Sequence, residues 1–184
     1  INSVHDFVRR RDQDREVVRP GLIMDAVMPL IHLQAQKLHV KVATRVDDGL
    51  SPVLCDRTMV EQVLLNLARN GMQAMDHPEC HNRVLTLHVK RAASSLSHGW
   101  IEFSVSDLGV GISADIEKQL FTPFFTTKSE GMGLGLWLSR SIVQSQGGSI
   151  TVSRSPLGGA LFTLSWPRIA STANSVDAAK AQTP

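Results

Sequence analysis

The chain has 184 residues, of which 42% are hydrophobic and 20% are charged, with a formal net charge of +2. This length and balance allow one sizeable hydrophobic core and exclude a disordered or fibrous chain. Basic residues are scattered apart from the run at residues 9–11, so no extended patch favours nucleic acid. The two cysteines make no disulfide framework, and no apolar run approaches the roughly 20 residues of a membrane span. We therefore expect a globular domain in a reducing cytoplasm.

The two ends of the chain differ in pattern from its middle. Residues 1–11 place four apolar side chains on one helical face, as in the last turns of an amphipathic helix whose beginning is absent. Residues 169–184 have no bulky apolar pattern and predict a disordered tail. We expect a fragment with one folded domain over residues 20–168, preceded by the end of a helix and a linker at residues 1–19.

The middle of the chain alternates between helical and strand periodicity. Helices are expected over about 22–38, 57–75, 114–120 and from the glycine-rich stretch to 146, and strands at 40–46, 52–55, 83–91, 100–107, 149–154 and 159–167. Asp56 is a plausible cap for the second helix, and Pro29 is a possible kink in the first. Because strand pairs occur without an intervening helix, the pattern predicts an α/β sandwich, in which helices cover one face of a mixed sheet.

Gly131, Gly133 and Gly135 stand at alternate positions before an apolar helix. Each glycine inside a helix costs roughly 1 kcal/mol relative to alanine, so another requirement must favour backbone without side chains. Neither a dinucleotide fingerprint nor a P-loop fits, because no strand precedes the stretch and the chain has no Gly-Lys pair. Such a helix start can hold phosphate oxygens on its backbone N–H groups, and close packing of two helices is the alternative.

Asn66 and Asn70 are four residues apart and therefore share one face of a predicted helix, beside an apolar stripe. An asparagine oxygen suits Mg²⁺, which takes one or two protein oxygens and completes its octahedron with water and phosphate. The alternative is that the two amides cap or hydrogen-bond a neighbouring loop.

Asp107 ends a predicted strand and is followed by Gly109 and Gly111. A carboxylate in this position can accept a hydrogen bond from an exocyclic amine such as adenine N6, while the glycines let the backbone approach a flat ring. A tight Asp-Gly turn is the alternative.

Phe121, Phe124 and Phe125 precede Thr127 and Lys128 in the stretch LFTPFFTTK. The aromatic side chains can anchor a mobile loop to the core while Lys128 faces phosphate. A hydrophobic loop lying on the core is the alternative.

In this order, and with Gly158-Gly159 before Phe162, the motifs resemble the N, G1, F, G2 and final glycine boxes of sensor histidine kinases of two-component systems. The resemblance covers residues 57–167, and residues 21–55 also fit the start of that domain. The stretches NGMQAM and PFFTTK look most like the branch that includes oxygen- and nitrogen-sensing kinases. The resemblance implies a GHKL (HATPase) ATPase fold that binds ATP and Mg²⁺ between the asparagine helix and a flexible lid, residues 112–132.

The same resemblance implies roles for individual residues. Asn70 would ligate Mg²⁺, Asn66 would orient water or phosphate beside it, and Asp107 would recognise adenine. The other nucleotide-binding residues that it implies are Gly109, Gly111, Thr127, Lys128, Gly131, Gly133, Gly135 and Leu136.

Two positions depart from the family pattern. Gln73 stands where many histidine kinases have a basic residue, so Lys128 and Arg69 are candidates to meet the phosphate charge. Gly71 stands where alanine is usual, which predicts a helix loosened by roughly 1 kcal/mol.

The resemblance also implies what lies outside these residues. His5-Asp6 looks like the acceptor dipeptide, but FVRRR lacks the residues that normally follow it, so we expect the acceptor histidine in a separate dimerisation domain upstream. The domain would transfer the ATP γ-phosphate to that histidine for relay to the receiver domain of a response regulator. The fragment would be a monomer, and the full-length homodimer a cytoplasmic protein or the cytoplasmic part of a membrane-bound sensor.

Two other functions and one other site remain as alternatives. A GHKL ATPase of the chaperone or mismatch-repair type would carry a glutamate base where Asn66 stands. A degenerate module would bind only a nucleotide or a partner. His77, Cys80 and His81 can in principle bind Zn²⁺, but a structural zinc site needs four ligands and no second pair is evident, which favours a polar loop.

Overall fold

The computed structural model describes residues 14–93, 99–129 and 131–169. The predicted helix end at residues 1–11 and the tail after residue 169 lie outside the described residues. Both cysteines are free. Within the described ranges, no helix has the length and apolar character needed to cross a membrane.

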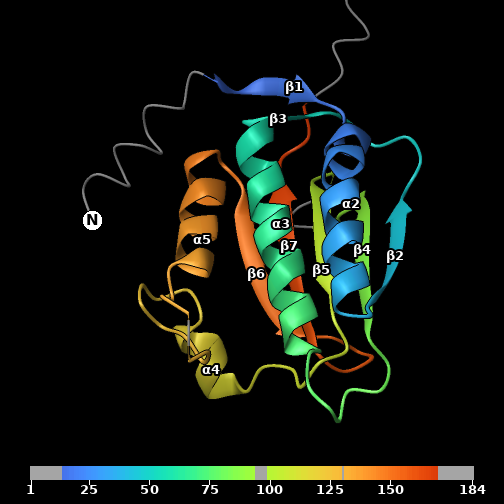
Figure 1. Cartoon of the computed structure of the whole chain (residues 1–184). Coiled ribbons are helices and arrows are strands. Elements are labelled where there is room, and N and C mark those ends of the chain that lie inside the picture. The colour runs from blue at the N-terminus through green and yellow to red at the C-terminus, as the bar shows by residue number, and fades with distance from the viewer. Residues whose placement is uncertain (1–13, 94–98, 130, 170–184) are drawn as a thin grey trace, which may run out of the picture.

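A five-stranded mixed sheet forms one layer of the molecule. Its strands, in spatial order, are β2 (Lys41–Val46), β4 (Val84–Arg91), β5 (Ile101–Ser106), β7 (Ala160–Trp166) and β6 (Ser149–Arg154). The pair β2 and β4 is parallel, and the other neighbours are antiparallel. The helices α2 (Pro20–Lys37), α3 (Arg57–Ala74) and α5 (Gly135–Ser145) lie side by side over one face of this sheet (Figure 1). The predicted α/β sandwich with helices on one face is confirmed.

The hydrophobic core lies between these two layers. Side chains of the central strands alternate between buried and partly exposed, because successive residues of a strand point to opposite faces. Trp166 and Phe103 meet edge to face in this core, with ring centroids 6.1 Å apart. The helix α2 continues through Pro29, which lies on its exposed side.

The start of α3 is tied to the end of α5. Asp56 caps α3 as predicted, because its Oδ1 accepts a hydrogen bond from the backbone N–H of Met59 at 3.1 Å. The backbone N–H of Asp56 itself donates to Oε1 of Gln146, a buried side chain just after α5, at 2.8 Å. One side chain therefore joins two helices that both contribute to the site described below.

Replacing Gln146 with leucine should destabilise the domain. The change leaves the buried N–H of Asp56 without its acceptor, which should cost about 1–3 kcal/mol of unfolding free energy. Gln144→Leu, at an exposed position in the last turn of α5, is the matched control. Thermal unfolding of the two variants checks this, and equal midpoints would contradict the role of the Gln146 hydrogen bond.

A second, two-stranded sheet pairs β1 (Glu16–Val18) with β3 (Val53–Cys55). It lies at one end of the sandwich in Figure 1. Val53 also bridges to Arg168, and the N–H of Ile169 donates to Pro52 O at 3.2 Å. No strand is predicted from the sequence at residues 16–18, because a strand of three residues is too short to show a period.

Candidate functional site

The predicted site residues come from segments that meet beside the C-terminal half of α3. The segments are the loop after β5, the lid at residues 112–132 with the short helix α4 (Ala114–Gln119), and the start of α5. Figure 1 shows the lid and α4 below α5, next to the lower half of α3. The geometry of each predicted residue follows from how these segments touch α3.

Asp107 is buried at the end of β5, with only 3% of its surface exposed. Its Oδ1 accepts two hydrogen bonds from backbone N–H groups, from Gly109 at 2.9 Å and from Ala160 at 3.3 Å. Its Oδ2 accepts no hydrogen bond from the described part of the chain. One oxygen is therefore fixed by the protein, and the other can accept from an external donor.

Glycines bring the neighbouring backbone close to Asp107. Gly159 has a φ of +74°, and a Cβ there would collide with the carbonyl oxygen of Asp107. A Cβ at Gly109 would lie 2.6 Å from the carbonyl oxygen of Ala74, at the end of α3. A Cβ at Gly71 would lie 2.8 Å from Cδ1 of Leu85. The departure at position 71 therefore has a packing reason that the sequence alone did not show.

Burial raises the pKa of the Asp107 carboxyl above its ordinary value of 3.8, and the hydrogen bonds from Gly109 and Ala160 offset part of this effect. Because the folded-state pKa is the higher one, the carboxyl contributes its full stability below the ordinary value. That stability is lost as the pH rises through the raised folded-state pKa. Above both pKa values the buried, ionised carboxyl is therefore a net cost to folding, which suggests a role other than stability.

Asp107→Asn should consequently raise the thermal unfolding midpoint at pH 7, because the amide has no charge to desolvate. The difference from wild type should shrink as the pH falls toward 3.8, where the wild-type carboxyl is itself protonated. Paired melting curves of both proteins across this range are the measurement. A variant that is less stable at neutral pH by an amount independent of pH would contradict the burial argument.

Asn66 and Asn70 lie on the same face of α3, as predicted, and each contacts a different segment. Nδ2 of Asn66 donates to Oγ of Ser139, a buried side chain on α5, at 3.1 Å. Oδ1 of Asn70 accepts from Nζ of Lys128 in the lid at 3.0 Å, and the same ammonium donates to Oε1 of Gln73. Ser139 is not among the site residues predicted from the sequence, and for Gln73 the sequence predicts only the lack of the positive charge usual at its position. The predicted alternative, hydrogen bonds from the two amides to neighbouring segments, is present.

The three glycines before α5 allow close approaches within the protein. A Cβ at Gly135 would lie 3.1 Å from Oδ1 of Asn66. Gly133 has a φ of +71°, and a Cβ there would lie 2.5 Å from the carbonyl carbon of Phe124, whose N–H donates to the oxygen of Gly133 at 3.0 Å. A Cβ at Gly131 would lie 2.7 Å from Oγ1 of Thr126. These glycines thus pack α5 against α3 and fold the lid backbone onto the start of α5.

One aromatic side chain holds the lid to the core. Phe121 packs edge to face on Phe162 of β7, with centroids 6.5 Å apart, and Cζ of Arg140 lies 5.5 Å from the Phe121 ring. Phe124 is 67% exposed and has a φ of +65°. The predicted aromatic anchor is confirmed for Phe121 and wrong for Phe124, because the turn against Gly133 directs that side chain away from the core.

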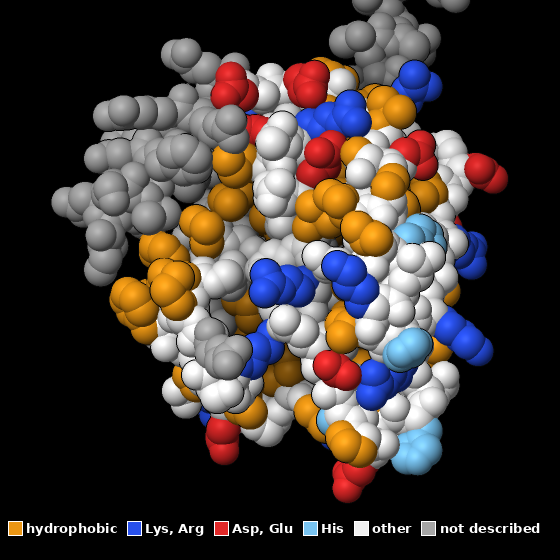
Figure 2. Space-filling view, viewed as in Figure 1, with side chains coloured by type: hydrophobic (Ala, Val, Ile, Leu, Met, Phe, Trp, Pro, Cys, Tyr) orange, Lys and Arg blue, Asp and Glu red, His pale blue; other side chains and the backbone are white. Residues whose placement is uncertain are grey.

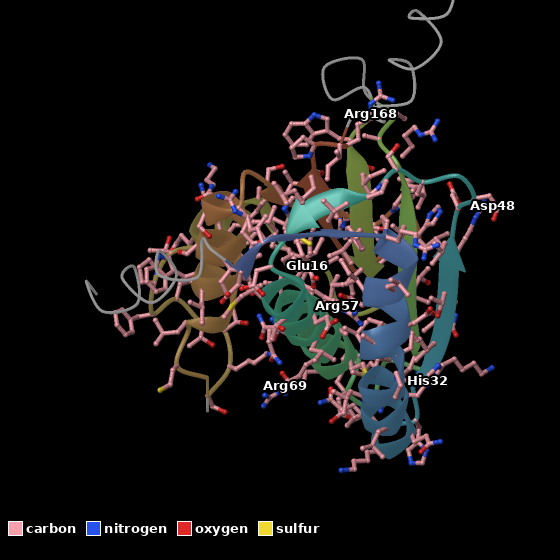
Figure 3. The ribbon with its side chains drawn as sticks, turned by 90° about the horizontal axis from the view of Figure 1, so that it is seen from above. Glu16, His32, Asp48, Arg57, Arg69 and Arg168 are labelled. Atoms are coloured by element: carbon pink, nitrogen blue, oxygen red, sulfur yellow. The ribbon has the colours of Figure 1, made fainter. Side chains whose placement is uncertain are left out.

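Positive charge gathers on this face of the molecule. Figure 2 shows Lys and Arg side chains near the middle of the face that carries α3, and Figure 3 shows Arg69 on the side of α3 away from the sheet. Burial, together with the charge of Arg69, lowers the pKa of Lys128. Thr127 is exposed beside Lys128, and Leu136 is partly buried against the core in the first turn of α5. These charges suit an anionic ligand.

The remaining predicted glycine, Gly111, lies beside Gly159 and has a φ of +77°. A Cβ at Gly111 would lie 3.3 Å from the carbonyl oxygen of Gly159. Asp107, Gly109 and Gly111 thus form one cluster with the end of α3. In the described part of the chain, no three His, Cys, Asp or Glu side chains are grouped so that they could hold a metal ion. The described residues therefore do not support a zinc site at His77, Cys80 and His81.

Comparisons with known proteins identify the family of this domain. Residues 55–170 match the family described as "Histidine kinase-, DNA gyrase B-, and HSP90-like ATPase". The C4-dicarboxylate transport sensor protein DctS of Rhodobacter capsulatus is 35% identical over 167 residues, which are 91% of this chain and 25% of DctS. Sensor protein FixL of Bradyrhizobium diazoefficiens is also 35% identical, over 91% of this chain and 32% of FixL.

Solved structures of histidine kinase catalytic domains have the same fold. The catalytic domain of the histidine kinase ThkA superimposes with a TM-score of 0.71 at 26% identity, over 84% of this chain and 95% of that one. The chain spans between a quarter and a third of the length of the two curated relatives. The similarity therefore concerns one domain of each of these longer proteins.

Proposed function

Because this chain belongs to the histidine kinase-, DNA gyrase B- and HSP90-like ATPase family, as an ATP-binding catalytic domain of the sensor histidine kinase type, we propose that it binds ATP and Mg²⁺ beside Asp107 and transfers the γ-phosphate to a histidine of a dimerisation domain. The observation that carries the proposal is the buried carboxylate of Asp107 with one oxygen fixed and one available. Such a group is costly to bury unless a ligand uses it.

Adenine recognition would use the available oxygen of Asp107. Its Oδ2 accepts from the exocyclic amine at N6, while the backbone at Gly109 and Gly111 leaves room for the ring. Guanine has a carbonyl oxygen at the corresponding position, which the carboxylate would repel. The site should therefore select ATP over GTP.

The phosphates would lie toward Asn70 and the lid. Oδ1 of Asn70 is a hard neutral oxygen that already accepts from a cation, so the residues present fit Mg²⁺. When bound, the ion would neutralise phosphate charge. The backbone N–H groups at Gly131, Gly133 and Gly135, with Thr127, Lys128 and Leu136 nearby, would complete the phosphate side of the site.

Catalysis would consist of positioning and charge neutralisation around the γ-phosphate. Asn66 has no carboxylate to deprotonate water, and its amide is held by Ser139. This disfavours the second candidate, a hydrolytic ATPase of another branch, which needs a general base at that position. Asn66 would instead orient phosphate or water beside the metal.

The partners follow from this assignment. We propose that the histidine acceptor domain belongs to the same full-length protein, that this protein is a homodimer with its kinase domains in the cytoplasm, and that the phosphate passes to a response regulator receiver domain. The basic residues are scattered along the sequence without an extended basic stretch, so we propose no nucleic-acid partner.

Calorimetric titration of the purified chain with ATP and GTP, each in Mg²⁺ and in EDTA, tests the proposal. ATP with Mg²⁺ should bind at least about tenfold more tightly than GTP, which corresponds to one lost or repulsive polar contact. Equal affinities for the two nucleotides would contradict the role of Asp107. Absence of any nucleotide binding would favour the degenerate interaction module.

A further inference from the structure

The ammonium of Lys128 lies between two amide oxygens of α3. Its Nζ donates to Oδ1 of Asn70 at 3.0 Å and to Oε1 of Gln73. The two side chains stand three residues apart and therefore project from the same helix face. Lys128 is 58 residues from Asn70 in sequence, so only the fold brings these groups together. Two neutral oxygens of one helix thus converge on one cation.

The surroundings hold this cation without a counter-charge. No carboxylate forms an ion pair with Lys128 in the described part of the chain. After burial, the like charge of Arg69 is the second cause that lowers the pKa of Lys128. Amide oxygens without a neutralising carboxylate make a site from which one cation can be displaced by another of higher charge.

The backbone around Lys128 directs its side chain at α3. The N–H of Lys128 donates to Oγ1 of Thr126 at 3.0 Å, and its carbonyl oxygen accepts from the N–H of Gly131 at 3.4 Å. A compact turn of the lid therefore presents the lysine. Its hydrogen bonds to Asn70 and Gln73 tie this turn to α3.

We propose that Asn70 and Gln73 form a two-oxygen cation cradle that Lys128 occupies in this conformation and the metal ion occupies in the nucleotide complex, with Gln73 as the second protein ligand of the metal. This inference rests on the proposed function and extends it to a residue outside the family pattern. Magnesium lies about 2.0–2.1 Å from its oxygen ligands, and its charge repels an ammonium at this short range, so the two cations do not occupy the cradle together. Metal binding therefore releases Lys128, and with it the lid turn, toward the phosphates.

The first experiment measures hydrogen exchange of lid amides between residues 112 and 129 in the protein without nucleotide. Lys128→Met should speed exchange several-fold, because it removes both hydrogen bonds between the lid and α3, and Gln73→Leu should speed it less, because the hydrogen bond to Asn70 remains. The double variant should exchange no faster than Lys128→Met, since that change already removes the hydrogen bond that Gln73→Leu removes. Lys118→Met, at an exposed lysine of α4, is the control. Unchanged exchange rates of the lid amides, or fully additive effects of the two substitutions, would contradict the role of Lys128 and Gln73 in holding the lid to α3.

The second experiment measures the Mg²⁺ concentration for half-maximal binding of a non-hydrolysable ATP analogue, with Lys128→Met as the background. Competition from the ammonium is then absent, and only the metal role of Gln73 remains. Adding Gln73→Leu should raise that concentration about tenfold, as for loss of a metal-site contact. Adding Gln62→Leu, an exposed amide of α3, should not change it.

The outcomes separate the two proposals. An unchanged Mg²⁺ requirement in Gln73→Leu, with the analogue still binding, would remove Gln73 from the metal site and leave the proposed function intact. Failure of the wild-type chain to bind the analogue at any Mg²⁺ concentration would contradict the proposed function itself, and the metal half of this inference with it.

Discussion

Asp107→Asn should reduce ATP affinity by roughly 30-fold or more, equivalent to about 2 kcal/mol. The expected loss is large because the structure determines how the new amide must lie. Its oxygen has to accept from the N–H groups of Gly109 and Ala160, which now bond Oδ1 of Asp107. The NH₂ group must then take the place of Oδ2 and face the adenine amine, so two donors would meet.

Calorimetric titration of wild type and Asp107→Asn with ATP in Mg²⁺ is the measurement. The thermal midpoint at neutral pH serves as the folding control, because the variant should be at least as stable as wild type. Asp48→Asn, at an exposed position far from the site in Figure 3, controls for the change in net charge. A folded Asp107→Asn protein with wild-type affinity would show that adenine is recognised elsewhere.

Asn70→Ala should weaken ATP binding by at least about tenfold in Mg²⁺ and by much less in EDTA, because the lost group is a metal ligand and not a base contact. The same change removes one acceptor of Lys128, but Gln73 retains the other. The two conditions are compared by titration on the same protein preparation.

The matched control for Asn70→Ala is Gln62→Ala, an exposed amide two turns earlier on α3. It should leave both affinities unchanged. Equal losses in EDTA and in Mg²⁺ for Asn70→Ala would assign Asn70 to direct contact with the nucleotide and would remove the metal from its role.

The layered fold was predictable because its elements carry strong periodic signals. The alternation in β4 and β5 and the stripe along α3 each repeat several times, and Asp56 caps α3 as its position predicted. The strand β1 has three residues and gives no such repeat. It exists because it pairs with β3, and that pairing depends on tertiary contact rather than on local sequence.

The candidate site was predictable where spacing along one element decides the geometry. Asn66 and Asn70 share a helix face because they are four residues apart, and the structure confirms it. The contacts of Gly71 and Gln73 depend on Leu85 and Lys128, which only the folded chain brings near. The exposure of Phe124 follows from the turn against Gly133, a backbone detail that aromatic spacing cannot show.

The most direct test of the account is phosphate transfer from γ-labelled ATP. The chain incubated alone with Mg²⁺ and labelled ATP should bind the nucleotide without labelling itself. The reason is that a nucleophile must lie within about 3–3.5 Å of the γ-phosphorus, and the acceptor histidine is proposed to belong to another domain. Adding the proposed histidine-containing dimerisation domain of the full-length protein as a separate chain should produce slow, acid-labile labelling of that domain. The rate should be low because the effective concentration of two unlinked parts is small. Strong labelling of the chain alone that disappears in His5→Ala would contradict the account and make His5 the acceptor.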